Sequence, residues 1–97
     1  MIAEFSVIPI GKEESLSPYV AECLKIVKAS GLNYQFTPMG TILEGDFDKV
    51  MGVIVECHKR IKAMSNRVST SIKIDDRTGS KDEIHRKTMS VEKRLAQ

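Results

Sequence analysis

The sequence has no apolar run long enough to cross a membrane and almost no excess charge of either sign. Its apolar stretches are far shorter than the roughly 20 residues that a membrane-spanning helix needs, and the N-terminus MIAEFSVIPI lacks the basic start and the cleavage site of a signal peptide. The 15 basic and 13 acidic residues are interleaved and leave a formal net charge of +2. This balance predicts no strong attraction to nucleic acid or to an anionic membrane.

Cysteine is also scarce. The chain contains only Cys23 and Cys57, which lie far apart and form no Cys-x-x-Cys motif. His58 and His85 likewise lack the spacing of metal ligands. We therefore expect free thiols in a reducing cytoplasm, with no metal and no cofactor.

The length and composition suit a globular chain of modest size. At 97 residues with 41% hydrophobic side chains, residues 1–97 are expected to form a single domain. A domain of this size supports one core but not a deep, enclosed active site.

The periodicity of apolar residues predicts seven elements in a definite order. A capping Ser17 before Pro18 and a terminating Gly31 delimit the first helix. The expected elements are a strand at 2–9, a helix at 18–30, strands at 33–37 and 41–45, a helix after Asp46, a strand at 67–75 and a C-terminal helix with the stripe Ile84, Thr88, Val91 and Leu95. This order predicts an α+β, ferredoxin-like β-α-β-β-α-β sandwich with an added C-terminal helix and the strand order 4-1-3-2.

Alternation along the strands separates a helix-covered face from an open face. With Met39-Gly40 as the hairpin loop, Thr37 is expected to face Ile42. On the open face, Glu44 is expected to lie on a central strand, beside Glu4 of the neighbouring strand. Polar residues on an open face are ordinary for an antiparallel sheet, but apolar side chains share this face and two neighbouring carboxylates repel each other. A subunit contact enclosing a polar pocket is the alternative, with six candidate ligand-binding residues: Glu4, Ser6, Thr37, Glu44, Ser69 and Ser71.

Four segments resemble the thiamine-binding-protein family, the small YkoF-like proteins. They are AEFSVIPIG at 3–11, SPYV at 17–20, PMGTILEGD at 38–46 and RVSTSIKIDDR at 67–77. The resemblance implies a ferredoxin-like fold, assembly into dimers and tetramers, and binding of thiamine or its hydroxymethylpyrimidine moiety rather than catalysis. We accordingly expect a homotetramer, built as a dimer of dimers, with a small-molecule pocket on the open face of the sheet at a subunit interface.

The candidate residues are compatible with such a ligand. Carboxylates can accept hydrogen bonds from an aminopyrimidine and favour the fixed positive charge of a thiazolium. A ligand-free oligomeric assembly protein of the same fold is the alternative, and a dry, close-packed sheet contact would be its sign. An RNA-binding module would need aromatic residues on the central strands, where Glu4, Ser6, Ile42 and Glu44 stand instead. No paired nucleophile and base is evident, so we expect no enzyme and assign no catalytic residue.

Overall fold

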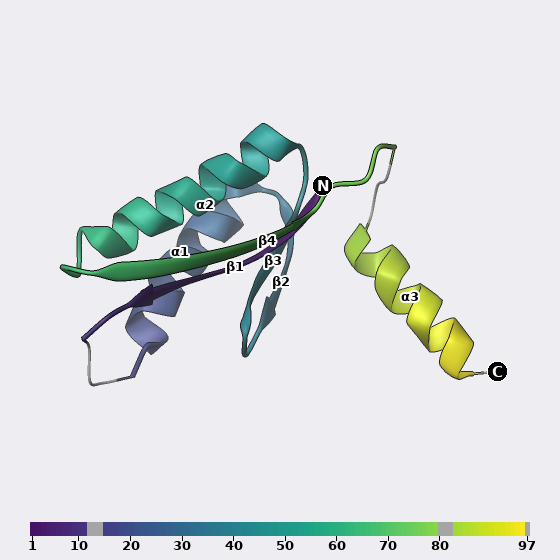
Figure 1. Cartoon of the computed structure of the whole chain (residues 1–97), viewed down its shortest axis with the longest axis horizontal. Coiled ribbons are helices and arrows are strands. Elements are labelled where there is room, and N and C mark those ends of the chain that lie inside the picture. Colours follow the sequence, from purple (N-terminus) through teal and green to yellow (C-terminus); the bar gives the residue numbers. More distant parts are fainter. Residues whose placement is uncertain (12–14, 80–82, 97) are drawn as a thin grey trace.

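The computed structural model describes residues 1–11, 15–79 and 83–96. Its elements are β1 (Ile2–Pro9), α1 (Ser17–Ser30), β2 (Asn33–Thr37), β3 (Gly40–Glu44), α2 (Phe47–Lys62), β4 (Val68–Asp75) and α3 (Glu83–Leu95). The strands form one antiparallel sheet in the order β2-β3-β1-β4, and α1 and α2 cover one of its faces (Figure 1). The predicted α+β, ferredoxin-like arrangement is confirmed.

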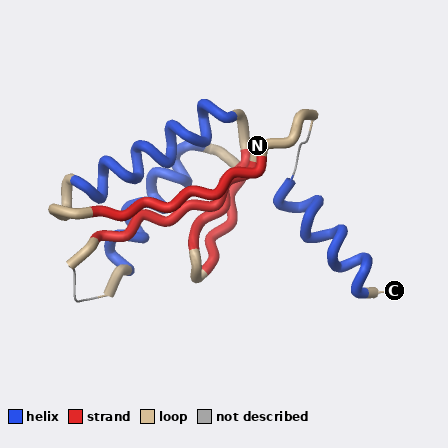
Figure 2. Tube along the Cα trace, in the orientation of Figure 1, coloured by secondary structure: helices blue, strands red, loops and turns tan. Residues whose placement is uncertain are grey.

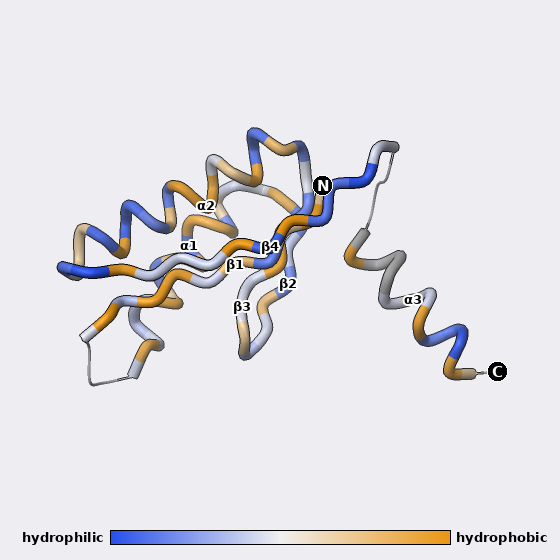
Figure 3. The backbone as a smooth tube through the Cα atoms, in the orientation of Figure 1, coloured by the Kyte–Doolittle hydropathy of each residue, from blue (hydrophilic) through white to orange (hydrophobic). Residues whose placement is uncertain are grey.

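The core lies between this sheet and the two covering helices. Along α2, hydrophobic residues alternate with hydrophilic ones at helical spacing (Figure 3), and the inward stripe buries Val50, Ile54 and Ile61 almost completely. Leu43 from the central strand β3 is equally buried beneath it. At the surface, Arg60 of α2 donates two hydrogen bonds to Glu22 of α1, at 3.2 and 3.1 Å. Hydrogen bonds from Lys25 and Arg60 lower the pKa of Glu22.

The start of α1 differs from expectation. Leu16 occupies the N-cap position, and Ser17 is already helical. The N–H of Ser17 donates to the Ser15 hydroxyl at 3.2 Å, so a serine two residues earlier serves this end of the helix. The helix ends as predicted at Gly31, whose φ of +74° is the left-handed conformation that glycine adopts without steric cost.

The β2–β3 hairpin is displaced from the predicted register. Thr37 pairs with Gly40 and Phe36 with Thr41, so Pro38 and Met39 form the tip. The Thr37 hydroxyl accepts hydrogen bonds from the N–H groups of Met39 and Gly40 at 3.2 and 3.1 Å, which fixes the turn one position earlier than expected. Because the partner of each residue changes by an even number of positions, the predicted faces are kept.

The helix α3 stands beyond the end of the sheet instead of lying on it (Figure 2). The molecule is correspondingly elongated, with extents of 48 × 28 × 20 Å. Met89, Val91 and Leu95 of α3 are 50%, 57% and 81% exposed. None of the helices in the described ranges is long and apolar enough to span a membrane.

Candidate functional site

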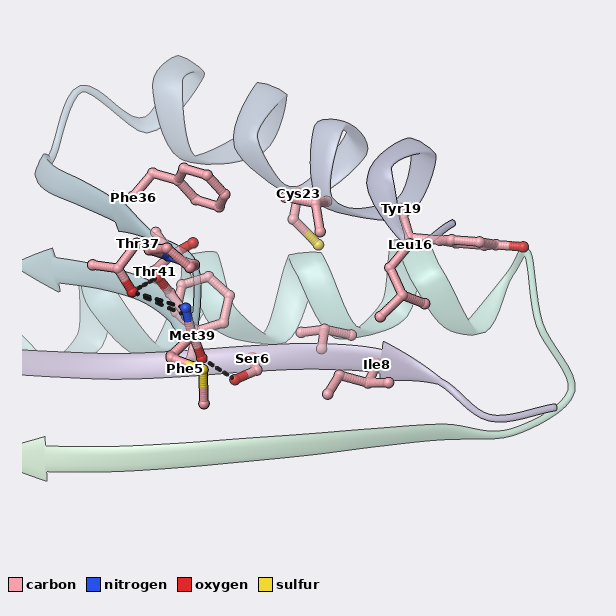
Figure 4. A pocket seen from close by; sticks show the side chains of 14 residues that line it. Phe5, Ser6, Ile8, Leu16, Tyr19, Cys23, Phe36, Thr37, Met39 and Thr41 are labelled. Carbon is pink, nitrogen blue, oxygen red and sulfur yellow. Dashed lines mark hydrogen bonds between the residues drawn. The ribbon is translucent and has the colours of Figure 1, made fainter. Parts of the chain in front are cut away.

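A hollow opens between the tip of the β2–β3 hairpin, the second half of β1 and the first turns of α1 (Figure 4). We call it the hairpin hollow. Its volume is about 160 Å³ and its walls are mostly apolar. The side chains that matter chemically are Phe5, Ser6, Tyr19, Cys23, Phe36 and Thr37.

The hollow exists because β1 is longer than the strand beside it. β1 pairs with β4 from Ile2 to Pro9, but with β3 only from Ile2 to Phe5, since β3 begins at Gly40. From Ser6 to Ile8, the side of β1 that faced β3 borders the hollow instead. A strand edge of this kind presents backbone donors and acceptors to whatever occupies the space beside it.

Two hydroxyl groups in the hairpin hollow differ in whether they are free to form a hydrogen bond with a ligand. The Thr37 hydroxyl donates to the carbonyl of Gly40 at 2.8 Å while accepting from two N–H groups of the tip, so its hydrogen-bonding capacity is used (Figure 4). The Ser6 hydroxyl donates to the Met39 carbonyl at 3.4 Å, which is long for an O–H···O bond. Ser6 can therefore turn to a ligand, whereas Thr37 holds the wall in place.

A thiol reaches the hollow from α1. Cys23 lines it, and the Cys57 thiol of α2 donates to the Cys23 carbonyl at 3.7 Å. A separate side-chain hydrogen bond between the two thiols lowers the pKa of Cys23 against the opposing effect of burial. That thiol–thiol hydrogen bond, together with burial, raises the pKa of Cys57. Cys23 is thus the thiol of the pair that ionises first.

A second, more open hollow lies on the face of the sheet away from α1 and α2. This open-face hollow measures about 280 Å³ and is lined by Ile2, Glu4, Ile42, Lys73 and Asp75. Glu4 pairs with Ile42 on one side and with Lys73 on the other. Charges of both signs therefore border this hollow, whereas no charged side chain lines the hairpin hollow among the residues that the structure describes.

The six predicted residues do not form one cluster. Ser6 and Thr37 line the hairpin hollow, Glu4 lines the open-face hollow, and Glu44, Ser69 and Ser71 line neither. Glu44 lies on the same face as Glu4 and on the neighbouring strand, but diagonally to it, because its direct partner on β1 is Ile2. On β2 it pairs with Asn33, whose side-chain amide donates to it at 3.1 Å.

Gly40, which lines the hairpin hollow, lies close to Glu4 of the open-face hollow. A Cβ added there would lie 3.3 Å from Glu4 Cγ and 3.5 Å from Ser6 Oγ. The Glu4 side chain, at its Cγ, and the Ser6 hydroxyl therefore both lie next to this glycine. A ligand in the hairpin hollow could extend past Gly40 towards Glu4.

Three contributors were missed by the sequence analysis: Tyr19, Cys23 and Phe36, from α1 and β2. Helical spacing places Cys23 on an apolar stripe and strand alternation places Phe36 on the covered face, so both were expected in the core, whereas Tyr19 was given no role. Only the unequal lengths of β1 and the hairpin arms indicated a gap beside them. Within the described ranges, no group of three or more His, Cys, Asp or Glu side chains could hold a metal ion.

The fold and the site define a small ferredoxin-like domain with a ring-sized hollow at a hairpin. Residues 3–92 match the family model of the thiamine-binding protein, and the chain belongs to this family. It is 36% identical over 91 residues to UPF0045 protein MJ1052 of Methanocaldococcus jannaschii, covering 94% of this chain and 91% of that protein. It is 41% identical over 100 residues to UPF0045 protein YqgV of Bacillus subtilis, covering 97% and 96%.

Solved structures agree with this membership. The crystal structure of MJ1052 matches with a TM-score of 0.86 at 37% identity, covering 93% of both chains. The Thermotoga maritima protein TM0486, described as a putative thiamine biosynthesis/salvage protein, matches with a TM-score of 0.76 at 20% identity, covering 90% of this chain and 96% of that one. At that identity the likeness concerns the fold alone.

Proposed function

We propose that this protein binds thiamine or its hydroxymethylpyrimidine moiety, without catalysis, and that the pyrimidine ring occupies the hairpin hollow. The family supports the class of ligand. The observation that carries the placement is the size and lining of the hollow. Its volume of about 160 Å³ is close to that of engineered apolar cavities of about 150 Å³ that take up benzene, so it suits one six-membered ring.

The lining suits a flat, weakly polar ring. Phe5 is buried at 3% exposure, whereas Phe36 is 52% exposed and can cover a bound ring from the mouth of the hollow. Ser6 and the adjoining edge of β1 offer hydrogen-bonding groups to the amino group and ring nitrogens of a pyrimidine. Small-molecule sites typically combine such apolar walls with few, well-placed polar groups.

The thiazolium of thiamine exceeds the hairpin hollow and would extend past Gly40. Glu4 lies on that side, with its Cγ 3.3 Å from where a Gly40 side chain would begin. A carboxylate at about 4 Å from a fixed positive charge contributes about 1 kcal/mol in a water-like surrounding, and more as the site becomes less polar. Glu4 should therefore favour thiamine over the uncharged pyrimidine alone.

Calorimetric titration with thiamine and with hydroxymethylpyrimidine tests both parts of the proposal. Ser6→Ala should weaken the binding of both ligands by about two- to twelvefold, the equivalent of one hydrogen bond of about 0.5–1.5 kcal/mol. Glu4→Gln should weaken thiamine by about fivefold and leave hydroxymethylpyrimidine unchanged. Glu44→Gln is the matched control, because Glu44 lines neither hollow and should leave both affinities unchanged.

The possible outcomes test the identity of the ligand and the location of its binding site separately. A wild-type protein that binds neither compound would refute the ligand assignment. If Glu44→Gln weakens binding while Ser6→Ala does not, the ligand lies on the open face, as the sequence analysis expected, and the hairpin placement is wrong.

A homotetramer built as a dimer of dimers is part of the proposal. The exposed apolar side chains of α3 and the isoleucines Ile2 and Ile42 of the open face support self-association. A ligand-free assembly protein is the second candidate, favoured by the same surfaces. Native mass spectrometry of protein isolated from cells distinguishes the two, because it reports the number of subunits and any retained ligand together.

A further inference from the structure

The two cysteines of the chain meet where α1 packs against α2. Both belong to the buried core, and both are free thiols. The Cys57 thiol donates to the Cys23 carbonyl at 3.7 Å, and a separate hydrogen bond joins the two thiols. The fold therefore brings together two thiols that lie 34 positions apart in the sequence.

The two thiols differ in how a small reagent can reach them. Cys23 lines the hairpin hollow, and Figure 4 shows its sulfur pointing from α1 into that space. Cys57 does not line the hollow and is 0% exposed, against 8% for Cys23. A small molecule that enters the hollow therefore meets Cys23 first. The lowered pKa of Cys23 and the raised pKa of Cys57 favour the same order, because the thiolate is the reactive form.

We propose that Cys23 and Cys57 form a redox-active pair, in which a hydroperoxide that enters the hairpin hollow oxidises Cys23 and Cys57 then closes a reversible disulfide. The pair is a modification site behind the wall of the hollow. This inference does not depend on the ligand proposed above. Closing the disulfide ties α1 to α2 and draws the Cys23 sulfur away from the hollow.

The reaction is balanced by the hydroperoxide alone. The Cys23 sulfur attacks the terminal oxygen of the hydroperoxide, the O–O bond breaks, and the products are a sulfenic acid on Cys23 and an alcohol, or water where the oxidant is hydrogen peroxide. The Cys57 sulfur then attacks the Cys23 sulfur. The S–S bond forms as the S–O bond breaks, and the hydroxide leaves with the Cys57 proton as water. Two thiols lose two electrons, and the hydroperoxide gains them.

The contact between the helices allows a disulfide. Helices that pack directly have axes about 8–10 Å apart, and their Cα atoms lie about 2.3 Å from each axis, so residues that face each other bring their Cα atoms to about 3.4–5.4 Å. Disulfides form at Cα separations of about 4.4–6.8 Å. The Cys57 sulfur already reaches the backbone of Cys23, and the hydrogen bonds from Arg60 to Glu22 join the same two helices nearby. Rotation of the two side chains is therefore the main change that bond formation requires.

Peptide mapping of the wild-type protein after exposure to hydrogen peroxide tests the proposal. The reduced protein is treated at a peroxide concentration that oxidises free glutathione over the same period, then blocked and digested without a reductant. The peptides of Cys23 and Cys57 should be joined within one chain, with a loss of about 2 Da from the intact protein. Dithiothreitol should restore both thiols. This map needs no substituted protein, so the test does not depend on how well a variant folds.

Two single substitutions check the order of the steps. In Cys57→Ala, Cys23 should stop at the sulfenic acid, which dimedone traps, and no disulfide within the chain can form. In Cys23→Ala, oxidation of Cys57 should be at least tenfold slower than the loss of thiols in the wild type. Wild-type cysteines that both stay reduced, a Cys23 that proceeds to the sulfinic acid without a disulfide, or a disulfide that joins two chains would each overturn the proposal.

Discussion

The hairpin tip offers the sharpest test of how the candidate site is built. Replacing Thr37 by Val keeps nearly the same shape but removes a hydroxyl that donates to the Gly40 carbonyl at 2.8 Å and accepts from the N–H groups of Met39 and Gly40. All three hydrogen bonds close the turn that forms one wall of the hairpin hollow. The substitution should therefore reduce stability and loosen that wall together.

The expected magnitude follows from where these groups lie. Each hydrogen bond contributes a net of about 0.5–1.5 kcal/mol, but groups at an exposed tip recover part of this by bonding to water. The Met39 N–H lies at the exposed tip, whereas Gly40 is half-buried. We expect Thr37→Val to lower the free energy of unfolding by about 1–2 kcal/mol. In a domain of this size, each kcal/mol corresponds to roughly 4–8 °C in Tm.

Urea-induced unfolding of the wild type, Thr37→Val and Thr37→Ser measures this difference. Thr37→Ser keeps the hydroxyl and should remain within about 0.5 kcal/mol of the wild type, since only a methyl group at a half-buried site is lost. If Thr37→Val unfolds at the wild-type urea concentration, the hydroxyl does not stabilise the tip. Reduced ligand affinity without reduced stability would show instead that Thr37 contacts the ligand directly.

Two further predictions concern Gly40 and the thiols. Gly40→Ala should destabilise the fold by about 1–3 kcal/mol, because the new Cβ would lie 3.0 Å from the Phe5 carbonyl oxygen. Gly52→Ala on α2 is the control: its new Cβ would have nothing within 4 Å, so it should stabilise the fold by up to about 1 kcal/mol. Equal effects in chemical denaturation would contradict this reasoning. A small alkylating reagent should label Cys23 before Cys57, faster as the pH rises, and bound hydroxymethylpyrimidine should slow the labelling. Peptide mass spectrometry that finds Cys57 labelled first, or no protection by the ligand, would count against the site.

The fold could be predicted because its determinants are local and repeated. The inward stripe of α2, with Val50, Ile54, Cys57 and Ile61, recurs at helical spacing. Alternation along β1 buries Ala3 and Phe5 while leaving Glu4 exposed, which sets the covered face of the strand. Many residues indicate each of these features, so a wrong prediction at one position does not change the predicted fold.

The details of pairing depend on single contacts, and the predictions failed there. Nothing in the alternation of β2 and β3 distinguishes a tip at Met39-Gly40 from one at Pro38-Met39, because both keep the same faces. The side chain of Thr37 selects between them. Thr37 was therefore expected to face Ile42, whereas it pairs with Gly40.

The hairpin hollow could not be predicted because it arises from where β3 begins relative to β1. β1 runs on to Pro9 beside β4, but it loses its β3 partner after Phe5, where the hairpin turns at Pro38 and Met39. Had β3 begun earlier relative to β1, a strand would cover the edge from Ser6 to Ile8 and fill the hollow. The sequence pattern determines which side chains face the helices. How far the β2–β3 hairpin extends along β1 determines whether a ring-sized space remains beside those side chains. The Thr37 hydroxyl fixes that extent by setting the position of the turn.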